Sequence, residues 1–175
     1  MSSLQYEWIL GFGVGIVIVI LAITKLFNRD GALRTKYDER QALARGKAYM
    51  YATYSMMFCC ILLMIMDMNN GIISRLGYMC YFIPVVIGII AQVSYSIFSD
   101  AYIGQNTNMT KYIIFMAIVS VLNISFGCMA LINGKMLENG KLTGSFANLC
   151  VGILFIIVAT ELILKKIIDG REERD

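Results

Sequence analysis

The residues best suited to chemistry lie in one polar stretch, KYDERQALARGKA at positions 36–48, between two long apolar runs. Asp38, Gln41 and Arg45 recur there at spacings of three and four, which places them on one face of a helix. Such a face could dock another protein or the chain's own C-terminal tail, or it could rest at the membrane surface with its cations near anionic lipid. The full candidate interaction face comprises Asp38, Glu39, Gln41, Arg45 and Lys47.

Polar residues inside the apolar runs form a second group of candidates, comprising Gln92, Asn123 and Glu161. Polar side chains within a membrane must face protein or water, so we expect Gln92 and Asn123 to make packing hydrogen bonds between helices. The alternative is that they line a ligand pathway near the break that Pro84 introduces into its helix. Glu161 precedes Lys165 by one helical turn, and this favourable order predicts an ion pair between them.

The cysteines give little basis for a metal or redox site. They occur in or beside apolar runs without a CxxC pair, and the chain has no histidine, so we expect buried, reduced thiols. Phosphate-loop, zinc-protease and nucleophile-elbow motifs are also absent from the sequence. These features predict a protein that is not an enzyme and that uses no cofactor or metal. The five cysteines are Cys59, Cys60, Cys80, Cys128 and Cys150.

The elements that must position these residues are membrane helices. The chain of 175 residues is 58% hydrophobic and 15% charged, and its apolar residues come in blocks too long for one small soluble core. We predict an all-α fold, an integral membrane bundle of five transmembrane helices in a single domain over residues 1–175. The spans are expected at about 8–27, 48–66, 76–98, 112–132 and 142–164. The lipid bilayer is the expected partner, and no folded basic domain favours nucleic acid.

Local signals indicate how the second helix begins. Thr35 followed by Asp38 fits a capping box, and Glu39 adds a negative charge near the helix N-terminus. The second helix should therefore extend into the cytoplasm for about three turns before it enters the membrane. We expect a short turn at residues 67–71 and a frayed helical end at residues 165–175.

The first span reads as a retained helix, because residues 1–7 lack the basic start of a signal peptide. Trp8 would lie at one membrane interface. Gly11 and Gly15 give a small-xxx-small face, which favours helix packing within the chain and leaves a homo-oligomer possible.

The basic residues set the orientation. With positions 25–47 inside, the predicted inner segments carry twelve Lys and Arg residues and the outer segments carry three. Short loops rich in Lys and Arg stay in the cytoplasm, so the N-terminus is predicted outside and the C-terminus inside.

The segment Tyr37–Ala48 resembles a motif of small uncharacterised multi-span membrane proteins from Gram-positive, clostridia-like bacteria. In that pattern D-E-R-Q is followed three residues later by R-G-K-A at the mouth of a transmembrane helix, as at positions 38–41 and 45–48 here. The resemblance implies a bacterial inner-membrane protein without an assigned activity, and it supplies no catalytic or ligand residues.

Three functional hypotheses follow from these patterns, the third being a channel built by oligomerisation through the glycine face of the first span. The first is a non-enzymatic membrane protein that acts through protein contacts as a regulatory, accessory or immunity-type factor, with a membrane or cytoplasmic protein as partner. The second is a small transporter, or the substrate-binding membrane subunit of one, built around Pro84, Gln92 and Asn123.

Overall fold

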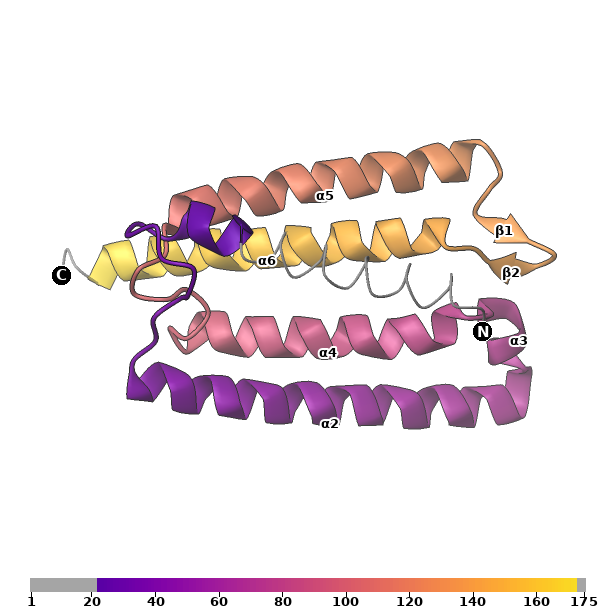
Figure 1. Cartoon of the computed structure of the whole chain (residues 1–175). Coiled ribbons are helices and arrows are strands. Elements are labelled where there is room, and N and C mark those ends of the chain that lie inside the picture. The colour runs from indigo at the N-terminus through magenta and orange to yellow at the C-terminus, as the bar shows by residue number, and fades with distance from the viewer. Residues whose placement is uncertain (1–21, 173–175) are drawn as a thin grey trace, which may run out of the picture.

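Four long helices dominate the computed structural model, which describes residues 22–172 (Figure 1). Each of the four is long and apolar enough to cross a membrane. A short helix and a two-stranded hairpin join them at one end. The elements in chain order are α2 (Glu39–Asn70), α3 (Ile72–Leu76), α4 (Met79–Phe98), α5 (Met109–Ile132), β1 (Leu137–Glu138), β2 (Lys141–Leu142) and α6 (Ser145–Glu172).

The predicted all-α class and the multi-span architecture are therefore confirmed for the described part of the chain. Residues 22–27 are also helical. The rest of the expected first span, with Trp8, Gly11 and Gly15, lies outside the described residues.

Helix α2 starts later than expected. The predicted capping box between Thr35 and Asp38 is wrong, because Asp38 is itself the N-cap and its box partner is Gln41. The Asp38 side chain accepts from the Gln41 N–H at 2.6 Å, and the Asp38 N–H donates to Gln41 Oε1 at 3.2 Å. Asp38 takes the N-cap position in place of Thr35 because its carboxylate accepts directly from a free N–H group in the first turn of the helix. Glu39 does lie in the first turn, as predicted.

The far end of α2 also differs from expectation. A turn was predicted from residue 67, but the helix continues to Asn70 and ends at Gly71, whose φ is 58°. A left-handed residue of this kind closes a helix, and glycine adopts it without a Cβ penalty. At 32 residues α2 is roughly 48 Å long, so it exceeds the hydrocarbon thickness of a bilayer.

Helices α4, α5 and α6 follow the predicted spans with shifted starts. Helix α4 begins at Met79 after α3 and runs through Pro84 to Phe98, and α5 is capped by the Asn108 side chain. The hairpin occupies residues 137–142, so α6 begins at Ser145. The predicted fraying is wrong over residues 165–172, since α6 continues as a regular helix to Glu172, while residues 173–175 lie outside the described residues.

The long helices lie side by side in the order α5, α6, α4, α2 (Figure 1). A close approach fixes the contact between α5 and α6, where a Cβ on Gly152 would lie 3.1 Å from the Ile124 nitrogen. Ser120 Oγ donates to the Gly152 carbonyl at 2.9 Å across the same contact. The main buried cluster lies between α4, α5 and α6, and consists of Val93, Ile97, Met116, Leu154, Val158, Ala159 and Leu162.

All five cysteines are free thiols, as predicted. Cys59 and Cys80 are buried, but Cys60 and Cys128 are exposed on apolar helix surfaces, so the expectation of burial is wrong for these two. Their exposure has a simple cause. Helices that lie in one row leave much of their apolar surface uncovered by other helices, as a bilayer permits.

Candidate functional site

The predicted interaction face lies at the end of the molecule where α2 and α5 begin and α4 and α6 end, which we call the basic end (Figure 1). Two loops cover it. One comprises residues 28–38, before α2, and the other comprises residues 99–108, between α4 and α5.

Backbone hydrogen bonds join these two loops along their length. The Arg29 N–H donates to the Asn106 carbonyl at 2.6 Å, and the Gln105 N–H donates to the Lys36 carbonyl at 3.0 Å. A third bond runs from the Asn108 N–H to the Phe27 carbonyl at 2.8 Å. The loops are therefore one folded unit.

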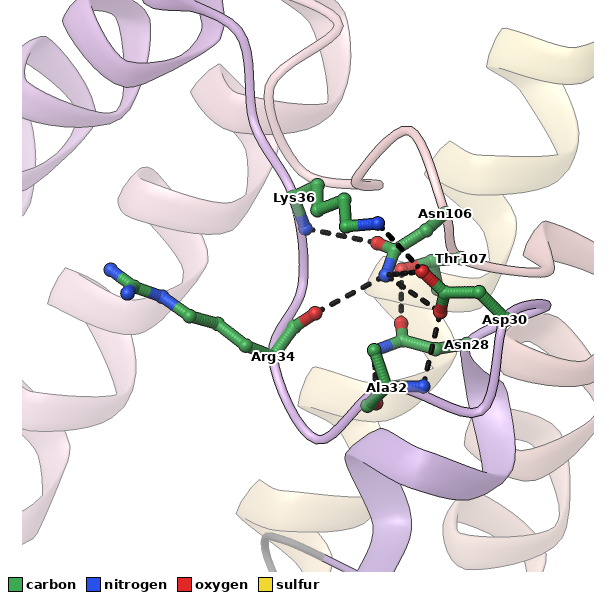
Figure 2. Close-up of polar contacts among 7 residues, drawn as sticks. All are labelled: Asn28, Asp30, Ala32, Arg34, Lys36, Asn106 and Thr107. Carbon is green, nitrogen blue, oxygen red and sulfur yellow. Dashed lines mark hydrogen bonds and ion pairs between the residues drawn. The ribbon is translucent and has the colours of Figure 1, made fainter.

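Asn106 is the centre of the side-chain network between the loops (Figure 2). Its Oδ1 accepts from the Lys36 N–H at 2.9 Å, and its Nδ2 donates to the Asp30 carboxylate at 3.1 Å and to the Arg34 carbonyl at 3.2 Å. Thr107 Oγ1 donates to Asn28 Oδ1 at 3.0 Å in the same cluster. Asn106 is buried and uses both ends of its amide, which favours one geometry of the loops.

Asp30 carries the electrostatic part of this cluster. Its carboxylate pairs with Lys36 Nζ at 2.9 Å and accepts from the Ala32 N–H at 3.1 Å. The hydrogen bond from Lys36, helped by those from Ala32 and Asn106, lowers the pKa of Asp30 to about 2. The loops also touch without an intervening side chain, because a Cβ on Gly104 would lie 2.8 Å from the Lys36 carbonyl.

Gln41 clamps the second loop to the start of α2. Only 7% of this residue is exposed, and its Nε2 donates to the Asp100 carbonyl at 2.6 Å and to the Ile103 carbonyl at 3.3 Å. Its Oε1 is bound to the Asp38 N–H in the capping box. Gln41 therefore serves the fold of the chain, and its amide is fully occupied there.

A chain of charges connects α2 and α6 through Asp100 of the second loop. Lys165 of α6 lies 2.8 Å from an Asp100 oxygen and 2.6 Å from an Asp169 oxygen, and Arg40 of α2 lies 3.7 Å from Asp100.

The predicted ion pair between Glu161 and Lys165 is wrong. Lys165 is turned to Asp100 and Asp169, while Glu161 Oε1 accepts from Ser94 Oγ on α4 at 2.7 Å. Lys165 gains two carboxylate partners outside the core, whereas Glu161 faces the contact between α4 and α6. Its Oε2 is buried without a hydrogen-bond partner among the described residues.

Arg45 lies over the Tyr37 ring, 4.2 Å from its centroid. This contact is a cation–π interaction and leaves the side chain of Arg45 half-buried. Burial raises the pKa of Tyr37. The Tyr37 ring also lines a cavity of about 230 Å³, whose wall includes Phe27, Tyr102 and Tyr112.

Much of the predicted interaction face is thus engaged within the chain. Asp38 caps α2, Gln41 clamps the loop, and Arg45 covers Tyr37. Glu39 and Lys47 remain exposed. Further basic side chains are exposed at the same end, and no acidic partner is recorded for them among residues 22–172: Lys25, Arg29, Arg34, Lys111, Lys166 and Arg171.

The three intramembrane candidates are not brought together by hydrogen bonds. Asn123 Nδ2 donates to the Val119 carbonyl of its own helix at 2.8 Å, so the expected interhelical bond is absent there. For the half-buried Gln92, no side-chain hydrogen bond is recorded among residues 22–172, and its main-chain carbonyl accepts from Ser96 Oγ at 2.8 Å. Among the described residues, Glu161 is bonded to another helix, through Ser94 of α4, and this contact was not predicted for it.

Sequence reasoning missed the residues that hold the loops together, namely Asn28, Asp30, Asn106 and Thr107. The pairing of two segments that lie far apart in the chain, such as Asn28 with Thr107, leaves no periodic signal in one sequence. The Asn-rich composition of residues 105–108 was the available hint, since Asn side chains readily bond to backbone groups in loops.

The fold and the charged end define a multi-pass helical membrane protein. The chain matches no protein-family model, no curated protein and no solved structure. Among residues 22–172, no group of three or more His, Cys, Asp or Glu side chains could hold a metal ion. Functional conclusions therefore depend on the geometry of the basic end.

Proposed function

We propose that this chain is a non-catalytic protein of the bacterial inner membrane that acts through protein contacts made by its basic end. A regulatory, accessory or immunity-type role fits such a surface. The bacterial assignment is supported by the D-E-R-Q and R-G-K-A pattern at positions 38–41 and 45–48. In this proposal the basic end faces the cytoplasm, with the C-terminus inside and the N-terminus outside.

One observation carries the proposal. The basic end is a surface folded by hydrogen bonds between its loops, and it presents exposed cations for which no acidic partner is recorded among residues 22–172. Lys36, Arg40 and Lys165 are paired with acids of the chain, and Arg45 is stacked on Tyr37. The exposed cations that remain are held on loops and helix ends whose backbone is fixed by hydrogen bonds. Preorganised charges of this kind favour fast and selective association with an acidic partner, because little ordering is needed on binding.

The transporter hypothesis receives less support from the same geometry. A carrier site needs polar groups that converge near the middle of the membrane. Asn123 is bonded to its own helix, and Glu161 is bonded to Ser94. We therefore keep protein contact as the leading function.

Capture of partners from solubilised membranes tests the proposal. The tagged full chain is purified in mild detergent as wild type and as the double variant Arg34→Gln/Lys47→Gln, which removes two exposed cations and no hydrogen bond of the loops. We expect a co-purifying protein whose recovery falls at least severalfold in the variant, and more at low salt than at high salt.

The matched control is Arg75→Gln/Lys135→Gln, which removes two cations from the opposite end of the molecule. This control should leave recovery unchanged. Equal recovery with all three proteins would refute protein contact through the basic end.

A further inference from the structure

An open cleft of about 650 Å³ lies at the end of the molecule opposite the basic end. Its walls come from α3, from the turn into α4 and from the β1–β2 hairpin, which Figure 1 shows together at that end. The volume is within the range of small-ligand sites. Its lining includes Ile73, Tyr78, Tyr81, Glu138, Lys141 and Leu142.

The two sides of the cleft are in contact. A Cβ on Gly144 would lie 2.8 Å from the Tyr78 hydroxyl, so the chain after the hairpin packs directly on the start of α4. The base of the hairpin is closed by Thr143, whose Oγ1 donates to the Lys135 carbonyl at 2.7 Å and whose N–H donates to the Met136 carbonyl at 3.0 Å.

Two opposite charges lie next to each other in this cleft. Glu138 and Lys141 face each other across the hairpin, and directly opposed residues have Cβ atoms only about 5 Å apart. Both are exposed, and no ion pair of either is recorded among residues 22–172. Neighbouring charges that remain unpaired suit a ligand that brings both a cation and an anion.

The position of the cleft narrows the class of ligand. It lies where the long apolar helices end, which is headgroup level for a chain that crosses a bilayer. Tyr78 is 56% exposed and Tyr81 is 77% exposed, and tyrosines at this depth are typical of the membrane–water interface. Ile73 and Leu142 add apolar surface beside the charges.

We propose that this cleft binds the headgroup of a zwitterionic phospholipid, with the phosphate at Lys141 and the ammonium group at Glu138. Lys is a common phosphate ligand, and a carboxylate accepts the ammonium N–H groups. The tyrosine rings cover the glycerol region. A headgroup with a phosphate but no ammonium leaves Glu138 beside a negative charge, so the cleft discriminates against it.

Native mass spectrometry of the full chain in mild detergent tests the proposal. The protein is mixed with equal amounts of phosphatidylethanolamine and phosphatidylglycerol, and the retained lipid is identified. We expect phosphatidylethanolamine to be retained severalfold more. Lys141→Gln should weaken its retention about tenfold, the scale of one lost charged contact. Glu138→Gln should remove the preference between the two lipids.

Lys135→Gln is the matched control, because Lys135 is an exposed cation of the same connection but does not line the cleft. Equal retention of the two lipids by the wild type would overturn the proposal, as would an equal loss in Lys135→Gln and Lys141→Gln. Soluble glycerophosphoethanolamine has the same headgroup but no acyl chains, so it tests whether the ligand is a membrane lipid or a free zwitterion. If it displaces phosphatidylethanolamine at matched concentration, the cleft binds the free zwitterion and the proposal of a lipid ligand is overturned.

Discussion

At the scale of single residues, the basic end depends on side chains that serve several partners at once. Gln41 binds two carbonyls of the second loop while its Oε1 completes the cap of α2. Asn106 of the second loop likewise accepts from the Lys36 N–H and donates to the Arg34 carbonyl of the first loop. A buried amide with all its groups bonded resists substitution, because each lost bond leaves a carbonyl or N–H unsatisfied.

Replacing Gln41 by alanine should therefore destabilise the chain. The change leaves the Asp100 and Ile103 carbonyls without their donor, and we expect a loss of about 1–3 kcal/mol in the free energy of unfolding. Thermal unfolding of the purified protein in detergent measures it. Glu39→Gln is the control, because Glu39 is exposed on the same turn, and it should change the midpoint far less. Similar midpoints for Q41A and the wild type would contradict the clamp.

The ion pair of Asp30 should make part of the stability depend on pH. The folded pKa of Asp30 is about 2, below its model-compound value of 3.8, so its charge stabilises the folded state above pH 3.8. That contribution is lost as the pH falls through about 2. We expect Asp30→Asn to unfold at a lower temperature than the wild type at pH 6, and the gap to narrow below pH 3.8. A gap that stays constant down to pH 2 would rule out this role of the Asp30 charge.

At the scale of elements, the positions of the helices could largely be predicted from the sequence, but the contacts between them could not. Long apolar runs predicted the four described helices within a few residues at most ends. The exceptions have local causes: Asp38 displaced Thr35 as the cap, and the hairpin delayed the start of α6 to Ser145. Neither the loop pairing at Asn106 nor the switch of Lys165 to Asp100 could be predicted, because both depend on which helix ends meet in space.

The contact between α5 and α6 should tolerate no side chain at Gly152. A Cβ there would lie 2.6 Å from Ile124 Cγ1 and 3.1 Å from the Ile124 nitrogen, so leucine must push the helices apart. We expect Gly152→Leu to lower the unfolding temperature markedly and to lose folded protein on size-exclusion chromatography.

Gly46→Ala is the matched control for this contact, because a Cβ at Gly46 meets nothing within 4 Å. Alanine is the better helix former, so this variant should be neutral or more stable by up to about 1 kcal/mol. If Gly152→Leu unfolds at the same temperature as Gly46→Ala, close packing at Gly152 is not required.

At the scale of the whole molecule, the described chain has two chemically different ends joined by four apolar helices. One end gathers most of the basic residues, on the first of two paired loops and on the helix ends around them, and the other carries an open cleft with one acid and one base for which no ion pair is recorded. The helices lie in a row, so much of the apolar surface between the ends is open to lipid. Function is therefore expected at the ends.

The orientation of these ends can be measured by cysteine accessibility in intact cells. In a variant without the native cysteines, Lys47→Cys should react with a membrane-impermeant maleimide only after permeabilisation, because the basic end is expected to face the cytoplasm. Asn139→Cys, at the tip of the hairpin, should react in intact cells.

Ser3→Cys tests the fifth span, since the N-terminus is outside only if residues 8–27 also cross. Labelling at position 3 in intact cells supports five spans. Protection at position 3 together with labelling at position 139 would leave four spans and refute the outside N-terminus, while labelling at position 47 in intact cells would invert the orientation of the whole molecule.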